Sequence, residues 1–249
     1  MLDDILEVYR ASGRFARALP LLFLVPALVE FAQHVAEVSI GMYDSRAAAR
    51  ALAGDPLRLA FGFAKTLALI FPGYWFVRFM AFDHDTTRAA ALEQPAAGLF
   101  AVQFLLLAAI QWLGLFGPSL GASIGAQGQA AQVASVVLAL AQSVLGIYLI
   151  AWFVAWPLGN RSVGPLRSVQ MIAGSFWRSV GYLLACTIPL MTVHYALGLG
   201  AVGLAPALRW PMLVADALAV GFLALTMYGG NFVAARAAAA RSSGRVITA

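Results

Sequence analysis

Six long apolar stretches dominate this chain, and each is long enough to cross the hydrocarbon core of a bilayer as a helix. A soluble protein with 62% hydrophobic and only 11% charged residues would expose much of that apolar surface to water. The fold class predicted is therefore all-α, an integral membrane bundle of about six transmembrane helices. The expected spans are 18–41, 57–80, 97–117, 131–156, 180–204 and 210–235.

The remaining segments complete a single polytopic membrane domain over residues 1–249. Residues 1–17 are predicted to be an amphipathic interfacial helix, with apolar side chains such as Phe15 on the membrane and arginines at its surface. The bundle itself is expected over 18–235, followed by a basic C-terminal tail, 236–249. A second amphipathic segment is expected within the bundle at 157–179. No separate soluble domain is expected.

The arginines indicate how the bundle is oriented. Eleven lie on one side of the predicted spans, and only Arg46, Arg50, Arg58 and Arg209 lie on the other. The positive-inside rule then predicts a protein of the inner (plasma) membrane with both termini in the cytoplasm. The net charge of +5 is explained by arginines at the ends of apolar spans. We expect them to bind anionic lipid head groups, and no nucleic-acid partner is expected.

The first 29 residues resemble a signal peptide, because basic residues precede a short apolar run. Glu30 follows that run in place of a small-residue cleavage pattern. We therefore expect an uncleaved first span.

Three polar residues interrupt the second half of that first span. Glu30, His34 and Glu37 are separated by four and three residues, a spacing that places them on one face of a helix. Carboxylates in contact with hydrocarbon are costly, so this face is expected to point into the bundle or toward water. Glu37 lies near the end of the span, where solvation alone would explain it.

Other spans carry ionisable residues at a similar depth. With a helical rise of about 1.5 Å per residue, Lys65, His194 and Asp216 all fall between the middle of the membrane and its outer interface, as Glu30 and His34 do. Four spans therefore bring polar side chains to one level. The predicted intramembrane cluster comprises Glu30, His34, Glu37, Lys65, His194 and Asp216.

Three interpretations of this cluster remain open from the sequence. It can be structural, with Lys65 paired to Glu30 or Asp216 and the histidines bonded across helices. It can line a polar cavity, open to the periplasm, that binds a polar ligand or relays protons. It can also hold a metal ion through His34, His194 and the carboxylates. No compact ligand motif accompanies these residues, so neither a cofactor nor a metal is predicted.

A faint internal repeat relates the two ends of the chain. Residues 13–17 (GRFAR) resemble 174–178 (GSFWR), and each segment precedes an apolar run, a proline and then a histidine. The next spans also align, since Lys65 and Asp216 each follow a Leu-Arg pair by the same interval. Spans one and two would then match spans five and six as two copies of one hairpin. Chance similarity among apolar helices is the alternative.

Residues 121–125 match the G-x-S-x-G pattern of serine hydrolases. That pattern needs a strand before the serine, whereas a membrane helix precedes Ser123 here. A distant histidine, His194, invites comparison with rhomboid proteases, but that family has its histidine in the last core span and His194 lies in the fifth. We expect a flexible loop at 121–125 and no enzyme.

Two smaller features also have structural explanations. The run Asp83-His84-Asp85 offers cation ligands, but Asp85 is better placed to cap a following helix. The single cysteine, Cys186, lies in an apolar run and is expected to serve packing.

A lead-in of the form Phe-x-Arg, used twice, connects the chain to a broad group of proteins. Phe15-Ala16-Arg17 and Phe176-Trp177-Arg178 each run into an apolar span. In this and in its six-span layout the chain resembles bacterial inner-membrane proteins of the YciC-like type, and the membrane region fused to some glycerophosphodiester phosphodiesterases. The resemblance implies an all-helical six-span bundle. The soluble phosphodiesterase domain is absent, so it implies neither catalysis nor any site residue.

These observations favour a transporter-like protein, or an accessory subunit of a transport system, that handles a small polar molecule or a lipid through the cluster. The alternatives are a structural or assembly factor with a closed cluster and, less favoured, a membrane enzyme. The expected partners are the lipid bilayer and either a protein partner or a second copy of the chain.

Overall fold

The structure, a computed structural model, describes residues 1–117, 125 and 128–243. Helices and their connections make up these ranges, which contain no strand, and the predicted all-α class is confirmed. The helices are α1 (Leu2–Ala18), α2 (Pro20–Ser39), α3 (Arg46–Ala51), α4 (Pro56–Ile70), α5 (Gly73–Ala81), α6 (Thr86–Ala90), α7 (Ala96–Phe116), α9 (Gly128–Tyr148), α10 (Ile150–Ala155), α11 (Pro165–Ala173), α12 (Phe176–Gly200) and α13 (Pro206–Ser243), with a 3-10 turn, η1, at Trp156–Leu158.

Six helical segments in the described chain are long and apolar enough to cross a membrane, as predicted. Their bounds differ from the prediction by more than a few end residues at three places. The predicted fourth span, 131–156, is divided at Leu149 between α9 and α10. The second span is divided, since α4 ends at Ile70 and Pro72 caps the start of α5, where a proline cannot continue the hydrogen-bond ladder. The last span extends to Ser243 because alanines, the best helix formers, follow it, so the expected tail is helical up to that residue.

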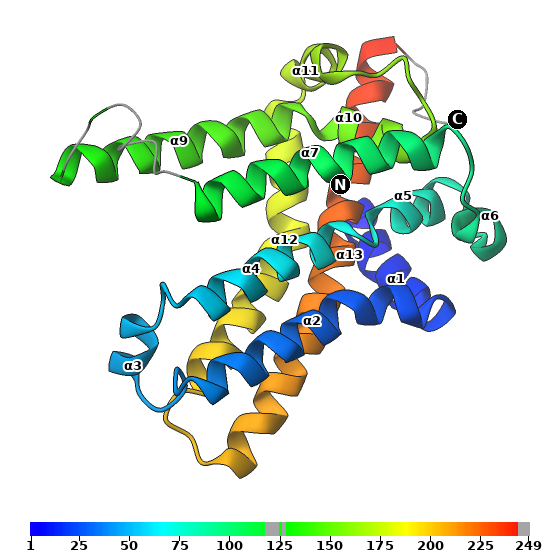
Figure 1. The fold of residues 1–249 in the computed structure, drawn as a ribbon. Coiled ribbons are helices and arrows are strands. Elements are labelled where there is room, and N and C mark those ends of the chain that lie inside the picture. The colour runs from blue at the N-terminus through cyan, green and yellow to red at the C-terminus, as the bar shows by residue number, and fades with distance from the viewer. Residues whose placement is uncertain (118–124, 126–127, 244–249) are drawn as a thin grey trace.

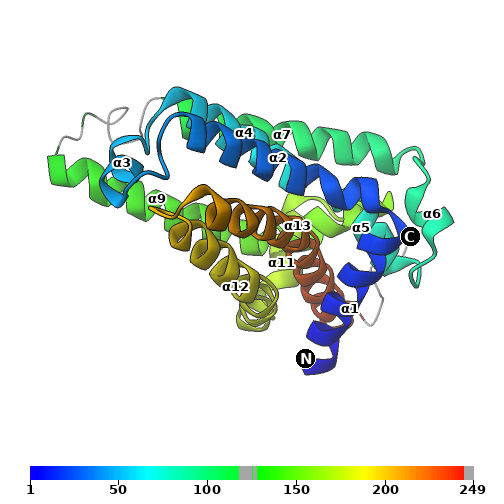
Figure 2. The ribbon, with the colours of Figure 1, turned by 90° about the horizontal axis from the view of Figure 1, so that it is seen from below.

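The spans form two layers. Helices α2, α4 and α7 run side by side in one layer, and α12 and α13 pack together in a second layer, which lies behind the first in Figure 1 and below it in Figure 2. The short helix α3 and the turn between α12 and α13 lie at the same end of the bundle (Figure 1). Both hairpins, α2–α4 and α12–α13, run toward this end and back, which is the orientation that the internal repeat predicts.

Helix α1 packs against the bundle, and Phe15, which was expected to lie on the membrane, is inside the protein. Phe15 is fully buried and meets Phe76 and Phe79 edge-on, with ring centroids 5.2 and 5.4 Å apart. Val8 is buried against Gly229 of α13, where a Cβ atom would collide with it. The amphipathic pattern of α1 therefore marks a face that binds helices.

Arg78 also departs from its expected role as an arginine at the membrane surface. Its side chain is buried, lies over the rings of Tyr74 and Phe82, and forms an ion pair of 2.8 Å with Glu93. Its guanidinium donates to the carbonyl of Arg88. Arg78 therefore ties the end of the second span to the segment that leads into α7.

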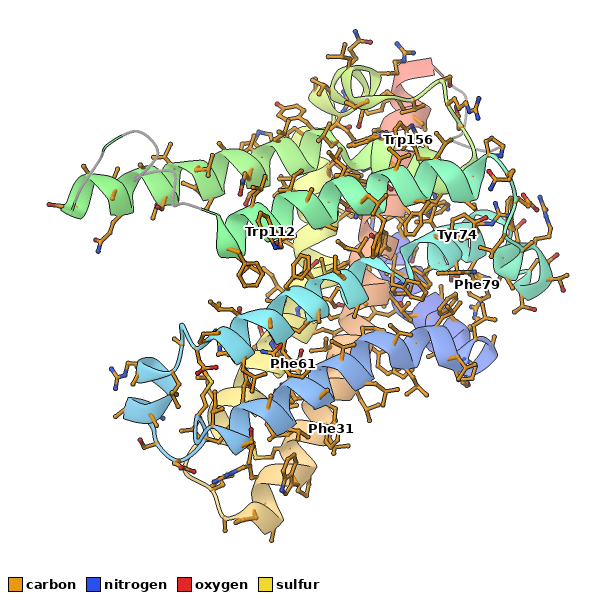
Figure 3. The ribbon with its side chains drawn as sticks, viewed as in Figure 1. Phe31, Phe61, Tyr74, Phe79, Trp112 and Trp156 are labelled. Atoms are coloured by element: carbon orange, nitrogen blue, oxygen red, sulfur yellow. The ribbon has the colours of Figure 1, made fainter. Side chains whose placement is uncertain are left out.

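Helices α7, α9 and α12 are the least enclosed spans. Among its described side chains α9 has none that is buried, and α7 buries only Ala96, Phe100 and Gln103. Large apolar side chains cover both helices, including Trp112 near the end of α7 (Figure 3). Such largely apolar surfaces are suited to lipid, although α9 also exposes Gln132 and Gln142.

Candidate functional site

The structure brings all six predicted cluster residues together around one pocket. The cavity has a volume of about 190 Å³ and lies between α2, α4, α12 and α13, toward the end that carries α3. The acidic, basic and histidine residues of its lining are Glu30, His34, Glu37, Arg58, Lys65, His194 and Asp216. Four helices that are distant in sequence therefore supply one polar site inside the membrane-spanning part of the chain.

Asp216 of α13 is the central acceptor of the site and is fully buried. One carboxylate oxygen, Oδ2, lies 2.9 Å from His34 Nε2, and the other, Oδ1, lies 2.7 Å from His194 Nδ1. Gly198 of α12 faces this carboxylate without a side chain, which leaves space beside it. Asp216 thus joins one histidine from each hairpin.

Glu30 of α2 forms the second acidic contact. Lys65 Nζ lies 2.9 Å from its Oε2 atom and donates to its Oε1 atom at 3.2 Å, so of the two partners left open for Lys65 the structure has Glu30. Oε1 also lies 3.4 Å from His34 Nε2 and 4.0 Å from His194 Nδ1. Glu30 and Asp216 therefore approach the same two imidazoles from different helices.

Glu37 is buried, so the expectation that it is merely solvated is wrong. Its carboxylate accepts a hydrogen bond of 2.8 Å from Gln33 and lies 3.3 Å from Arg58 Nε and 3.4 Å from His34 Nδ1. The Tyr43 hydroxyl lies 3.0 Å from the same Nδ1 atom. Its burial and the nearby carboxylates raise the pKa of Tyr43, so the phenol stays neutral.

His34 can exchange partners when it gains a proton. With hydrogen on Nε2 alone, the imidazole donates to Asp216 and accepts from the Tyr43 hydroxyl at Nδ1. With both nitrogens protonated it donates to Asp216 and to Glu37. One protonation step therefore switches a hydrogen bond from tyrosine to carboxylate without a change of helix position.

The charges of the pocket are not balanced by its fixed cations. Glu30, Glu37 and Asp216 supply three negative charges, while Lys65 and Arg58 supply two positive ones. Buried charges require compensation, so a proton on one imidazole or a bound cation completes the site.

The acidic groups are deeper than the cations. The Asp216 side chain is 0% exposed, whereas those of Lys65 and Arg58 are 21% and 32% exposed. The pocket therefore has an acidic floor and a basic mouth.

Three residues that contact Glu37 or His34 in the pocket escaped the sequence analysis. Gln33 lies on the polar face of α2 with Glu37, so its helical spacing was an available signal. Arg58 was counted as an indicator of orientation, and its pairing with Glu37 depends on how α2 and α4 pack. Tyr43 lies in a connection, where periodicity gives no information.

The other candidate residues lie apart from this pocket. Asp85 caps α6 by accepting from the backbone of Thr87 and Arg88, as predicted, and His84 binds Glu7 and Arg14 of α1 instead of being solvated. Cys186 is buried and unpaired, as expected for a packing residue. The expected loop at 121–125, with Ser123, lies outside the described residues apart from Gly125.

Comparisons of the chain with protein-family models, with curated proteins and with solved structures found no match. The geometry of the site is therefore the basis for its proposed function.

Proposed function

We propose that this protein is a transporter-like membrane protein, or the membrane subunit of such a system, that binds a small polar solute in the pocket between α2, α4, α12 and α13. The observation that supports the proposal is the convergence of seven acidic, basic and histidine side chains from four helices on one cavity. If these side chains served only to hold the helices together, so many charges would add little stability, since buried ion pairs often contribute no net stability.

The location follows from the arginine distribution. We place the protein in the inner membrane with both termini in the cytoplasm, which puts α3 and the turn between α12 and α13 on the outer side. The pocket lies toward that side, so the solute would enter from outside. The basic mouth, Arg58 and Lys65, would meet it first.

A structural or assembly factor is the second candidate, and the completeness of the pairing favours it. Each carboxylate of the cluster has at least one nitrogen within 3.3 Å. In that case the exposed face of α9 would bind a protein partner or a second copy of the chain. Anionic head groups remain proposed partners of the arginines under both candidates.

Water accessibility of the pocket separates the two candidates. In a Cys186→Ala background, we would introduce Gly198→Cys, whose Cβ would lie 3.8 Å from Asp216 Oδ2 with no steric conflict. Val193→Cys on α12 is the matched control, because its side chain does not line the pocket and is exposed on the apolar surface. Val202→Cys, on the lining near the mouth, is a second probe that stays away from the carboxylate.

Each variant would be treated in intact cells with a charged, membrane-impermeant thiol reagent. Labelling at positions 198 and 202 but not at 193 is the expected result for an outward-open pocket. Protection at all three positions, in protein that elutes as a folded species, would reject the solute-binding proposal in favour of the structural one.

A further inference from the structure

We infer that the polar pocket is a binding site for a divalent transition-metal ion such as Zn²⁺, with Glu30, His194 and Asp216 as its protein ligands. The inference rests on the proposed function and specifies the class of solute. The first support is geometric: one donor atom from each of these residues lies within 4.8 Å of the other two.

The individual distances suit an ion of this size. His194 Nδ1 lies 2.7 Å from Asp216 Oδ1 and 4.0 Å from Glu30 Oε1. Ligands that surround zinc tetrahedrally at about 2.0–2.2 Å are about 3.4 Å from one another. The observed separations lie on both sides of that value, so small side-chain rotations would seat an ion. The three donors come from α2, α12 and α13, whose packing fixes their positions.

A neighbouring residue holds the other oxygen of the Asp216 carboxylate. His34 Nε2 binds Asp216 Oδ2 at 2.9 Å, which leaves Oδ1 directed toward His194. On Glu30, Lys65 Nζ contacts both oxygens, Oε2 at 2.9 Å and Oε1 at 3.2 Å, and Oε1 is the oxygen directed toward His194. An outer partner that orients a ligating carboxylate, as His34 does for Asp216, is a regular feature of metal sites and strengthens the binding.

The donor set indicates the class of ion. An imidazole nitrogen beside two carboxylates is typical of zinc and of other first-row transition metals, whereas magnesium and calcium prefer oxygen ligands alone. Three protein ligands leave a coordination position that opens into a cavity of about 190 Å³. An ion held with an open position can exchange water and leave again, which fits a carried solute better than a structural ion.

Lys65 sets the affinity of the site. Its ammonium group shares Glu30 with the proposed ion and repels it, but the side chain is 21% exposed and has room to move toward the mouth. Removal of this charge should tighten metal binding. A purely structural cluster predicts no gain in metal affinity, because there the loss of Lys65 only removes an ion pair.

The test is equilibrium titration of the full chain, purified in detergent, with Co²⁺ followed by visible absorption and with Zn²⁺ by competition. We expect saturable binding of one ion per chain and no displacement by Mg²⁺. Glu30→Gln and His194→Ala should weaken binding by about 100-fold or more, and His34→Ala by about 10- to 100-fold. Lys65→Met should bind several-fold more tightly.

His84→Ala is the matched control, because His84 lies outside the pocket and binds Glu7 and Arg14. It should bind as the native chain does, and equal loss in His84→Ala and His194→Ala would overturn the inference by indicating adventitious binding. If the ligand variants do not fold, the inference is tested on the native chain and on Lys65→Met. It is overturned if neither of these two proteins binds the metal ion. Labelling of Gly198→Cys without metal binding would reject the ion and leave the proposed function standing.

Discussion

Helix α13 and the pair of helices α7 and α9 place their apolar side chains in opposite surroundings. All three helices are apolar enough to span a membrane, yet α13 buries most of its surface within the protein, while α7 buries little of its surface and α9 buries none of its described side chains. α13 carries Asp216 inside, whereas the polar side chains of α9, such as Gln132 and Gln142, are exposed. Hydrophobicity alone therefore does not reveal which helices form the core.

The two regions differ in how much stability a substitution is expected to remove. In the α2, α4, α12 and α13 region, polar groups depend on partners from other helices, so one substitution strands several charges. In the α7 and α9 region, side chains meet the surroundings of the protein, and a substitution alters little within it. The difference predicts a graded set of mutational effects.

The largest effect is expected at Asp216. Asp216→Ala removes the acceptor of both His34 and His194 and should lower the free energy of unfolding by about 3–5 kcal/mol. Thermal unfolding in detergent would measure it, with Gln142→Ala on α9 as the control, expected to stay within about 0.5 kcal/mol. Equal losses for the two variants would remove the distinction between the regions.

A matched pair of leucines tests the same distinction without charge. Leu225 of α13 is fully buried, while Leu140 of α9 is 62% exposed. Leu225→Ala should cost about 2–5 kcal/mol through the cavity it leaves, and Leu140→Ala should cost well under that. If Leu140→Ala proved as costly in detergent, α9 would have a protein partner on that face.

A smaller effect concerns the pair of Lys65 and Glu30. Lys65→Met should lower stability by about 1–3 kcal/mol, because Glu30 is left buried without its ammonium partner. The double variant Lys65→Met/Glu30→Gln should lose less than the sum of the two single variants. Simple additivity in a double-mutant cycle would show that the two side chains do not interact.

The smallest effect is expected at the opposite end of the bundle, where Asp4 of α1 binds Arg236 at 2.8 Å. Partial burial alone would raise the pKa of Asp4, but the Tyr182 hydrogen bond and the charges of the N-terminus and Arg236 hold it below 3.8. A lowered folded-state pKa stabilises the protein above 3.8, and this contribution disappears as the pH falls below that value.

Solvent screening limits the contribution of Asp4 to no more than about 1 kcal/mol. Unfolding midpoints of the native chain and Asp4→Asn, measured from pH 6 down to pH 3, would test this (roughly the range over which a carboxylate titrates). The two proteins should converge at the acid end. A difference that grew with acidity would contradict the assigned sign.

The sequence was sufficient for the class of fold, the six spans and the members of the cluster. Charged residues inside apolar helices have few allowed positions, so Glu30, His34 and Asp216 had to face one another or water. The sequence was insufficient to predict contacts that depend on how two helices pack against each other. Phe15 and Arg78 carry ordinary interfacial patterns, but Phe15 packs on the rings of Phe76 and Phe79, and Arg78 pairs with Glu93.

The length of α13 has a mechanical consequence. Its 38 residues extend for about 57 Å, more than the 40–45 Å of a whole bilayer with its head groups. The same helix, which has Pro211 in its first part, carries Asp216 and, about 30 Å further along, Arg236 with its contact to α1. A tilt of about 10° at the pocket would displace that contact by about 5 Å. Binding in the pocket can thus shift the contact between Arg236 and α1 at the far end of α13. Distances between spin labels at the pocket and at this contact would measure the shift.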